Sequence, residues 1–239
     1  WFCFKLCLVR NSIEIIIVLI FCGSLIQAFI ATKIPGIRIK KEAACTVKAK
    51  VLLTPKVVVF LFCAFLMLVS HGAYYGFFSI HLENMGFGST FIGLTWALAS
   101  AAEILVMIRS NQIFRRFSLE SVLIFSFMIA ALRWFVLCFV QSAAAILLSQ
   151  VMHAVTYGTF HIASILYIDR LTPDKAKTLG QAANNAVSYG LGLMVGFFFS
   201  GYVYEISGSF TLFLISSLIA LSGGLFFGGF YWVDRRRAQ

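Results

Sequence analysis

Residues 57–68 read VVVFLFCAFLML and residues 121–132 read SVLIFSFMIAAL, two apolar runs without a charged residue. Neither run alternates apolar and polar residues, as the strands of an outer-membrane β-barrel do. Both lie inside longer apolar stretches of about 20 residues, the length that a helix needs to cross a bilayer. These runs predict an all-α membrane protein.

The composition of the whole chain indicates the same class of protein. Of the 239 residues, 61% are hydrophobic and 12% are charged, which lies far outside the range of soluble domains. The net charge of +10 could attract nucleic acid, but the basic residues lie mostly in loops between apolar stretches, so no nucleic-acid partner is expected. The six cysteines show no metal or disulfide spacing, and we expect no metal and no cofactor.

About seven transmembrane helices are expected, near residues 13–32, 57–81, 89–109, 120–140, 143–168, 179–203 and 210–232. We divide the chain into one helix with a short apolar N-terminus, a basic linker, a six-helix unit and a basic tail, at residues 1–32, 33–56, 57–232 and 233–239. The six helices fall into two groups of three, which indicates three-plus-three structural repeats.

The positions of the basic residues predict the orientation in the membrane. Most of the 19 Lys and Arg residues lie in four segments on one side, at 33–56, 109–116, 170–177 and 235–237. The loops that alternate with these segments contain no Lys or Arg. Because basic loops are retained in the cytoplasm, we expect a cytoplasmic C-terminus in a multi-pass protein of a bacterial inner or plasma membrane.

Two charged residues lie inside the predicted spans, Glu103 and Arg133. A charge at the bilayer centre costs about 2.5–3.5 kcal/mol on insertion scales, so it faces a cavity or a partner. The two residues lie on consecutive helices, and opposite charges would offset part of each other's desolvation. A functional pair and a pair that only fixes packing both remain open. At 1.5 Å per residue, Glu103 is expected roughly 10 Å closer to the cytoplasmic face than Arg133.

A polar stripe is expected on the helix at 143–168. At 100° per residue, its members fall within a band of roughly 80°; they are Gln150, His153, Tyr157, His161 and Ser164. Such a stripe predicts a surface that lines water or substrate. The alternative is hydrogen bonding between helices, which polar residues commonly provide in membrane bundles.

The helix at 179–203 repeats the pattern with Gln181, Asn184 and Asn185, which can hydrogen-bond a solute or a neighbouring helix. The glycines of Gly192-x-x-x-Gly196 predict a close approach of two helices. On the earlier helices, His71, Tyr75 and Trp96 lie on aromatic faces. Such faces are typical of pockets for organic ligands, and aromatic side chains are also common where a helix meets lipid.

A proton-coupled protein needs a group that gains and loses a proton near the working pH, and Glu103 and His153 are the candidates. Arg133 stays protonated. When Arg133 lies close to Glu103, its positive charge favours the ionised form of Glu103. This effect is lost when the helices move apart. Our hypothesis is that this coupling links proton binding to a conformational change.

Several segments resemble a known family, namely residues 70–79 (SHGAYYGFFS), 93–98 (GLTWAL) with Ala102-Glu103, 131–134 (ALRW), 150–161, and 180–182 (GQA). They resemble the C-terminal half of major facilitator transporters, nearest to the phenylpropionate-transporter type, which is related to lactose-permease-like and nucleoside proton symporters. The resemblance covers about residues 57–232. It implies that the seven helices are the sixth to twelfth of a twelve-helix transporter, with residues 33–56 as the central cytoplasmic linker.

The resemblance also implies roles for particular residues. In lactose-permease-like relatives, a Glu, an Arg and a His on the eighth, ninth and tenth helices serve proton coupling and substrate linkage, which corresponds to Glu103, Arg133 and His153. The acidic residue that relatives carry one turn after that His is missing, and Tyr157 stands nearby. The basic cytoplasmic motif of the superfamily survives as Phe114-Arg115-Arg116-Phe117, without its Asp and Gly.

Taken together, the residues and the resemblance predict part of a secondary active transporter, a proton-coupled symporter of a small organic solute such as an aromatic acid. Its expected partners are the solute, protons, the lipid bilayer and a missing N-terminal six-helix half. Candidates for substrate or ion-pair contacts are Arg133, His71, Tyr75, Trp96, Gln150, Tyr157, His161, Gln181, Asn184 and Asn185. The alternative is a seven-helix receptor or sensor. An enzyme is not expected, because no Ser/His/Asp arrangement and no His-Glu-x-x-His sequence occurs.

Overall fold

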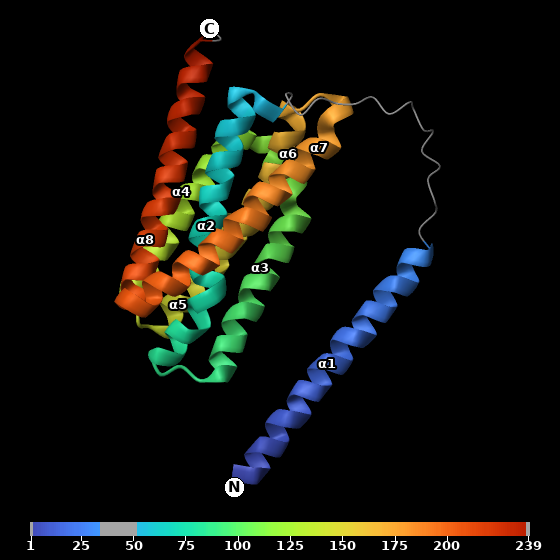
Figure 1. Ribbon diagram of the computed structural model, residues 1–239, viewed down its shortest axis with the longest axis vertical. Coiled ribbons are helices and arrows are strands. Elements are labelled where there is room, and N and C mark those ends of the chain that lie inside the picture. Colours follow the sequence, from blue (N-terminus) through green and yellow to red (C-terminus); the bar gives the residue numbers. More distant parts are fainter. Residues whose placement is uncertain (1, 34–51, 238–239) are drawn as a thin grey trace. The chain divides into compact units, whose positions relative to one another are not determined.

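The computed structural model describes residues 2–33 and 52–237, and the regular structure in these two ranges is helical throughout (Figure 1). The α-helices are α1 (Phe2–Lys33), α2 (Pro55–Asn84), α3 (Ser89–Arg116), α4 (Leu119–Phe139), α5 (Ala143–His153), α6 (Phe160–Leu171), α7 (Lys177–Asn184) and α8 (Leu193–Arg237). Two π-helical segments, η2 (Ala154–Thr159) and η4 (Asn185–Gly192), and the 3-10 turn η3 (Asp174–Ala176) connect some of them. The prediction of an all-α membrane protein is confirmed.

Five helical stretches within the described ranges are long and apolar enough to cross a membrane, Pro55–Asn84, Ser89–Arg116, Leu119–Phe139, Ala143–Leu171 and Asp174–Arg237. The last has 64 residues, and Gly208 interrupts it with φ 72° and ψ −176°. Glycine adopts such a conformation readily because it has no Cβ atom. Figure 1 shows the chain reversing its direction within α8, from an orange limb to a red limb. This stretch therefore has two limbs, close to the predicted spans at 179–203 and 210–232.

One predicted loop is wrong. Residues 109–116 were expected to lie between helices, but α3 continues to Arg116. The segment contains no Gly or Pro to end the helix, and the basic side chains of Arg115 and Arg116 in its last turn suit the negative end of the helix dipole. The turn comes only at Ser118, whose hydroxyl oxygen accepts a hydrogen bond from the backbone N–H of Ser121 and caps α4.

The N-terminal helix forms a unit of its own, apart from residues 46–239. It begins at Phe2, earlier than the expected residue 13. The described side chains of this helix, at residues 15 and 17–33, are exposed, and residues 17–33 form an apolar helical stretch. Most of the predicted linker at 33–56, namely 34–51, lies outside the described residues, as do the last two residues of the predicted tail at 233–239.

Helix α2 is the centre of the second unit. It packs against α8 and η4, and the backbones touch at two glycines. A Cβ atom on Gly72 would lie 2.6 Å from the Cα of Gly196, and one on Gly196 would lie 2.7 Å from the carbonyl oxygen of Val69. The predicted close approach of a helix at Gly192-x-x-x-Gly196 is confirmed, because no larger residue fits there without a shift of the backbone.

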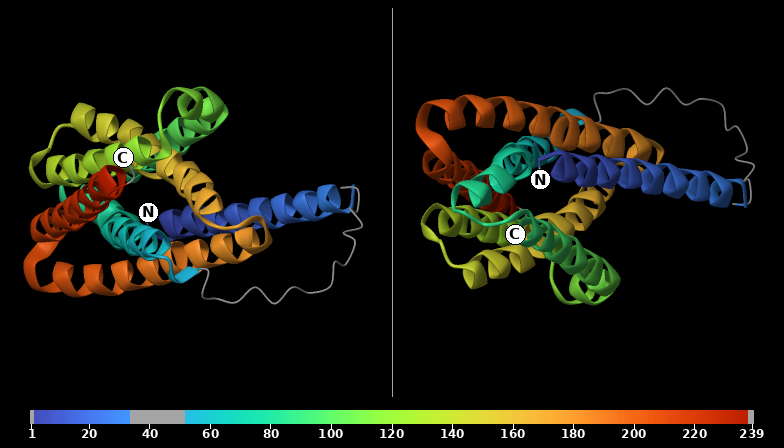
Figure 2. Two further views of the ribbon diagram at one scale, coloured as in Figure 1. Left: turned by 90° about the horizontal axis from the view of Figure 1, so that it is seen from above. Right: turned by 90° about the horizontal axis from the view of Figure 1, so that it is seen from below.

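Helix α3 lies at the edge of the bundle in both views of Figure 2. It packs mainly against α5 and η2. In its most apolar stretch only 11% of the residues are buried, which is the lowest share among the five candidate spans of the described chain. This lightly packed helix carries Glu103.

Candidate functional site

Three of the predicted residues form a connected chain in the middle of the bundle. Glu103 on α3 approaches His153 at the end of α5, with 2.7 Å between Oε1 and Nε2. Arg133 on α4 approaches the same ring from the other side, with 2.8 Å between its guanidinium and Nδ1. His153 therefore bridges the offset that the sequence predicts between Glu103 and Arg133, and the two charges meet through the imidazole ring.

The hydrogen-bond chemistry fixes the protonation of this chain. An arginine side chain can only donate hydrogen bonds, so Nδ1 of His153 accepts from Arg133. The proton of the neutral ring then lies on Nε2 and is donated to the carboxylate of Glu103. In this state a positive Arg133, a neutral His153 and a negative Glu103 balance their charges, which lowers the cost of burying them in the membrane.

Arg133 is fully enclosed by protein. Its exposed fraction is 0%, and a second guanidinium nitrogen donates to Oε1 of Gln150 at 3.2 Å. The guanidinium carbon also lies 4.2 Å from the ring centre of Tyr74 and 4.7 Å from that of Trp134, distances at which cations are attracted to aromatic faces. These contacts with protein groups hold Arg133 as the partner of His153.

The predicted aromatic faces meet beside this chain. The rings of Tyr75 and Trp96 are stacked at 6.2 Å and 18°, and the Trp96 N–H donates to the hydroxyl of Ser79 at 2.9 Å. Both rings are only partly buried. His71 lies deeper, with an exposed fraction of 0%, and its Nδ1 donates to the carbonyl oxygen of Met67. Tyr75 and Trp96 can therefore contact a bound molecule, whereas His71 cannot in this conformation.

A ladder of rings runs from His153 along η2 and α6. The rings of His153 and Tyr157 are stacked at 5.4 Å, and those of Tyr157 and His161 at 6.3 Å and 7°. Nδ1 of His161 lies 2.6 Å from the hydroxyl of Tyr189 on η4. π-Helical segments occur often at functional sites, and here both of them contribute to the ladder, which extends the site across two helical segments.

Three other candidates lie apart from the hydrogen-bonded residues Glu103, His153 and Arg133. Gln181 donates to the carbonyl oxygen of Ile165 at 2.9 Å, and Asn184 accepts from the hydroxyl of Ser188 at 3.2 Å. Asn185 is exposed. Among the described residues no hydrogen bond joins these amides to His153 or Arg133, so the structure favours the reading of Gln181 as a link between helices.

The structure adds four residues that the list of candidates lacks: Tyr74, Trp134, Thr156 and Tyr189. Tyr74 donates to Oε1 of Gln150 at 2.8 Å, and Thr156 lies 3.5 Å from the guanidinium of Arg133. Tyr74 and Trp134 stand next to predicted residues in the sequence and could have been chosen on that ground. Tyr189 could not, because only the folded arrangement brings its hydroxyl within reach of His161.

Glu103 is the member of the chain that is most open to its surroundings. Its side chain is 20% exposed, compared with 2% for His153. Gly158 on η2 faces it, and a Cβ atom there would lie 3.5 Å from Cγ of Glu103. The carboxylate can therefore exchange a proton while the imidazole stays enclosed. The described residues contain no cluster of side chains that could hold a metal ion.

These features define a multi-pass α-helical membrane protein with a buried chain of charged and polar groups. A family model described as "MFS_1 like family" matches residues 5–215. The chain belongs to this family of membrane transporters.

Three curated relatives show what the chain is similar to. A probable 3-phenylpropionic acid transporter of Escherichia coli (strain K12) is 30% identical over 162 residues, covering 68% of this chain and 42% of the relative. A protein of the same strain, named as a nucleoside transporter, is 26% identical over 62% of this chain and 35% of the relative. Maltose permease of Geobacillus stearothermophilus is 24% identical over 62% and 38%. The chain spans less than half the length of these relatives.

The family match confirms the predicted resemblance to major facilitator transporters of the phenylpropionate type. These relatives are named as transporters, and none of the comparisons supports the receptor alternative. An integral membrane protein with several spans is shown by the apolar helices and by the family.

Proposed function

We propose that this chain forms one half of a proton-coupled symporter for a small organic solute such as an aromatic acid. The observation that carries the proposal is the chain of hydrogen bonds from Arg133 through His153 to Glu103. Ionisable residues within membrane helices mark substrate or proton pathways by default. The other half of the cavity would come from a six-helix N-terminal unit, since such sites lie between the halves of a transporter.

The proton would bind at Glu103. If His153 took it instead, its Nδ1 would carry a hydrogen and could no longer accept from Arg133. Two positive groups would then face each other in a buried place, which is unfavourable. A proton on Glu103 keeps the bond between Arg133 and His153 and removes only the negative charge that attracts the Nε2 hydrogen. Glu103 is therefore the proposed proton carrier, and His153 is the group that holds it.

Protonation at this position would loosen α3. This helix packs mainly on α5 and η2 and is buried over a small part of its surface. The bond from Glu103 to His153 ties it to α5. When the carboxylate becomes neutral, the bond loses its ionic part and α3 can shift relative to α5. A bound proton thus changes the conformation of a helix that lines the proposed solute cavity.

The proposed class of solute rests on three aromatic side chains of the site and on the name of one relative. Tyr75, Trp96 and Tyr157 are partly buried, and the rings of Tyr75 and Tyr157 pack against the ring of His153. Pockets for organic ligands combine such aromatic surface with a few polar groups. One relative is named as a probable 3-phenylpropionic acid transporter. We propose a small aromatic acid, and we propose that the C-terminus lies in the cytoplasm, as the basic segments predict.

Transport in proteoliposomes tests the proposal. The chain would be joined to the five preceding helices that complete a twelve-helix transporter, and uptake of labelled 3-phenylpropionate would be driven by an inward proton gradient. Glu103→Gln should abolish gradient-driven uptake and keep exchange of labelled for unlabelled solute, because exchange needs no net proton movement. The matched control is Glu83→Gln at an exposed position. Uptake that keeps its rate and its pH dependence in Glu103→Gln would contradict the proton-carrying role.

A further inference from the structure

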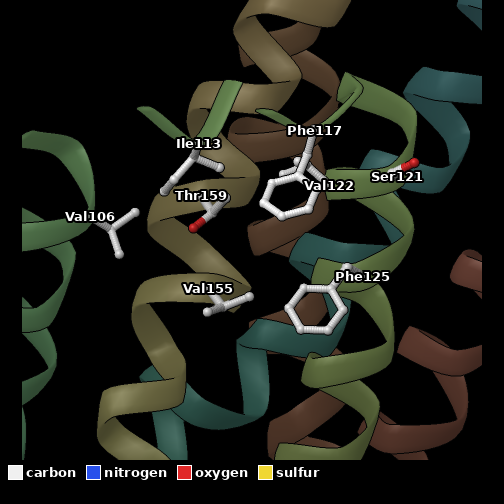
Figure 3. A pocket seen from close by; sticks show the side chains of 8 residues that line it. All are labelled: Val106, Ile113, Phe117, Ser121, Val122, Phe125, Val155 and Thr159. Carbon is white, nitrogen blue, oxygen red and sulfur yellow. The ribbon is translucent and has the colours of Figure 1, made fainter. Parts of the chain in front are cut away.

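An apolar groove runs along α3 from Val106, which lies one turn after Glu103. Its volume is about 460 Å³, and Figure 3 shows side chains from α3, α4 and η2 facing it, among them Val106, Ile113, Phe117, Phe125 and Val155. From Val106 to Phe117 the groove follows α3 for roughly 16 Å, at 1.5 Å per residue. It ends where α3 ends.

Two arginines lie beside this groove, on the same side of α3 as its lining residues. Arg109 and Arg116 are seven residues apart and follow Val106 and Ile113 by three positions each, so that all four lie on one side of the helix. The guanidinium of Arg116 lies 5.9 Å from the ring centre of Phe117, which lines the groove. Both arginines are exposed, and neither pairs with a carboxylate in the part of the chain that the structure describes.

The end of the groove offers a second feature that suits an anion. Ser121 lines it from the first turn of α4, and the N-terminal turn of a helix favours negative charge. Glu120 in the same turn does not oppose this, because its carboxylate is paired with Arg170 on α6. The arginines and the start of α4 therefore give the mouth of an apolar groove a positive character.

We propose that this groove is a binding site for one anionic phospholipid, with an acyl chain along α3 and the phosphate between Arg116 and the start of α4. An acyl chain gains little by leaving other lipid for an apolar groove, because both surroundings are equally apolar. The preference for this lipid must therefore come from the headgroup. Basic pockets at the ends of membrane helices attract anionic headgroups.

Native mass spectrometry of the purified full chain in detergent tests the site, with dioleoylphosphatidylglycerol as the anionic lipid and dioleoylphosphatidylcholine as the zwitterionic one. We expect one tightly bound phosphatidylglycerol and weaker binding of phosphatidylcholine. Arg116→Gln should weaken the binding of phosphatidylglycerol by about fivefold, and the double variant Arg109→Gln with Arg116→Gln should weaken it by about 30-fold. Ile113→Trp keeps both arginines but fills the groove, and it should also weaken binding.

Two matched controls separate the groove from surface charge. Arg236→Gln removes an arginine that lies 3.5 Å over the ring of Trp232 at the end of α8, away from the groove. Leu148→Trp adds the same bulk at an exposed position of α5. Neither should change the affinity for phosphatidylglycerol. Inorganic phosphate, which has no acyl chain, should not displace the lipid.

The proposal is overturned if both lipids bind equally, or if Ile113→Trp keeps the affinity of the unchanged chain, since the charges alone would then explain binding. Displacement of the lipid by inorganic phosphate, or by a second copy of the chain, would also overturn it. These results do not depend on transport, so the lipid site and the proposed symport can fail separately.

Discussion

Helices α2 and α3 follow each other in the sequence and are held in the bundle in opposite ways. In the most apolar stretch of α2, 67% of the residues are buried, and in that of α3, 11%. α2 touches the backbone of the α8 limb at Gly72, whereas a Cβ atom on Gly93 of α3 would meet no atom within 4 Å. The carboxylate that contacts His153 nevertheless lies on the lightly packed α3, at Glu103.

This difference separates stability from function. α2 has the tight contacts that fix the fold, and α3 has room to move around one charge-assisted hydrogen bond between Glu103 and His153. Elements that move in a working cycle generally come from the less stable parts of a protein. We therefore expect substitutions on α2 to affect folding and equivalent substitutions on α3 to affect coupling.

Gly72→Ala should have the largest effect on stability. The new methyl group would lie 2.6 Å from the Cα of Gly196, and overpacking of this kind destabilises a protein by up to about 3 kcal/mol. Gly93→Ala is the matched substitution on α3 and should stabilise the helix slightly, because alanine favours helices more than glycine does. Unfolding in mixed detergent, followed by circular dichroism, measures both. Equal stability of the two variants would remove the contrast between the helices.

Leu68→Ala should have a smaller effect of the same sign. Leu68 on α2 has an exposed fraction of 0%, and its removal leaves a cavity that destabilises the fold by about 2 kcal/mol, the packing part of the loss. Leu105→Ala on α3, where the side chain faces outward, should change the free energy of unfolding by less than about 0.5 kcal/mol. The same unfolding assay compares them. If Leu105→Ala lowered the free energy of unfolding as much as Leu68→Ala does, α3 would be packed as tightly as α2.

Glu103→Gln should hardly change global stability and should loosen α3 locally. The amide oxygen of the glutamine can still accept the Nε2 hydrogen of the neutral His153, so the bond loses only its charge-assisted part, about 1 kcal/mol. Amide hydrogen exchange in α3 should therefore become up to about fivefold faster while that of α2 stays constant. Exchange measured by mass spectrometry resolves the two helices. Exchange in α3 that is unaffected by Glu103→Gln, with Glu83→Gln as the reference, would mean that packing alone holds this helix.

The helical bundle could be predicted from the sequence because apolar length decides it. The runs at 57–68 and 121–132 lie inside α2 and α4, and Gly208 lies in the loop expected between the last two spans. The end of α3 was missed because the arginines of 109–116 suit both a basic loop and the last turns of a helix. The π-helical segments η2 and η4 have no periodic signal that separates them from an α-helix.

The candidate site could be predicted less completely. Glu103, Arg133 and His153 stand out as ionisable groups in apolar surroundings, but their order in space does not follow from the sequence. Helix positions alone leave Glu103 and Arg133 at different depths, and only the reach of the His153 ring closes the gap. Tyr189 joins His161 through packing between distant helices. The roles of these residues in transport stay predictions.

A distance measurement between α3 and α5 tests most directly whether Glu103 and His153 form a proton-dependent tether. Spin labels at Leu105→Cys and Leu148→Cys, both outward-facing, would report the distance by pulsed electron resonance in a background without the native cysteines. On acidification, the distance between the two labels in the protein with Glu103 should shift to the value that the Glu103→Gln variant shows at every pH. The same distance in both proteins across the whole pH range would contradict the account.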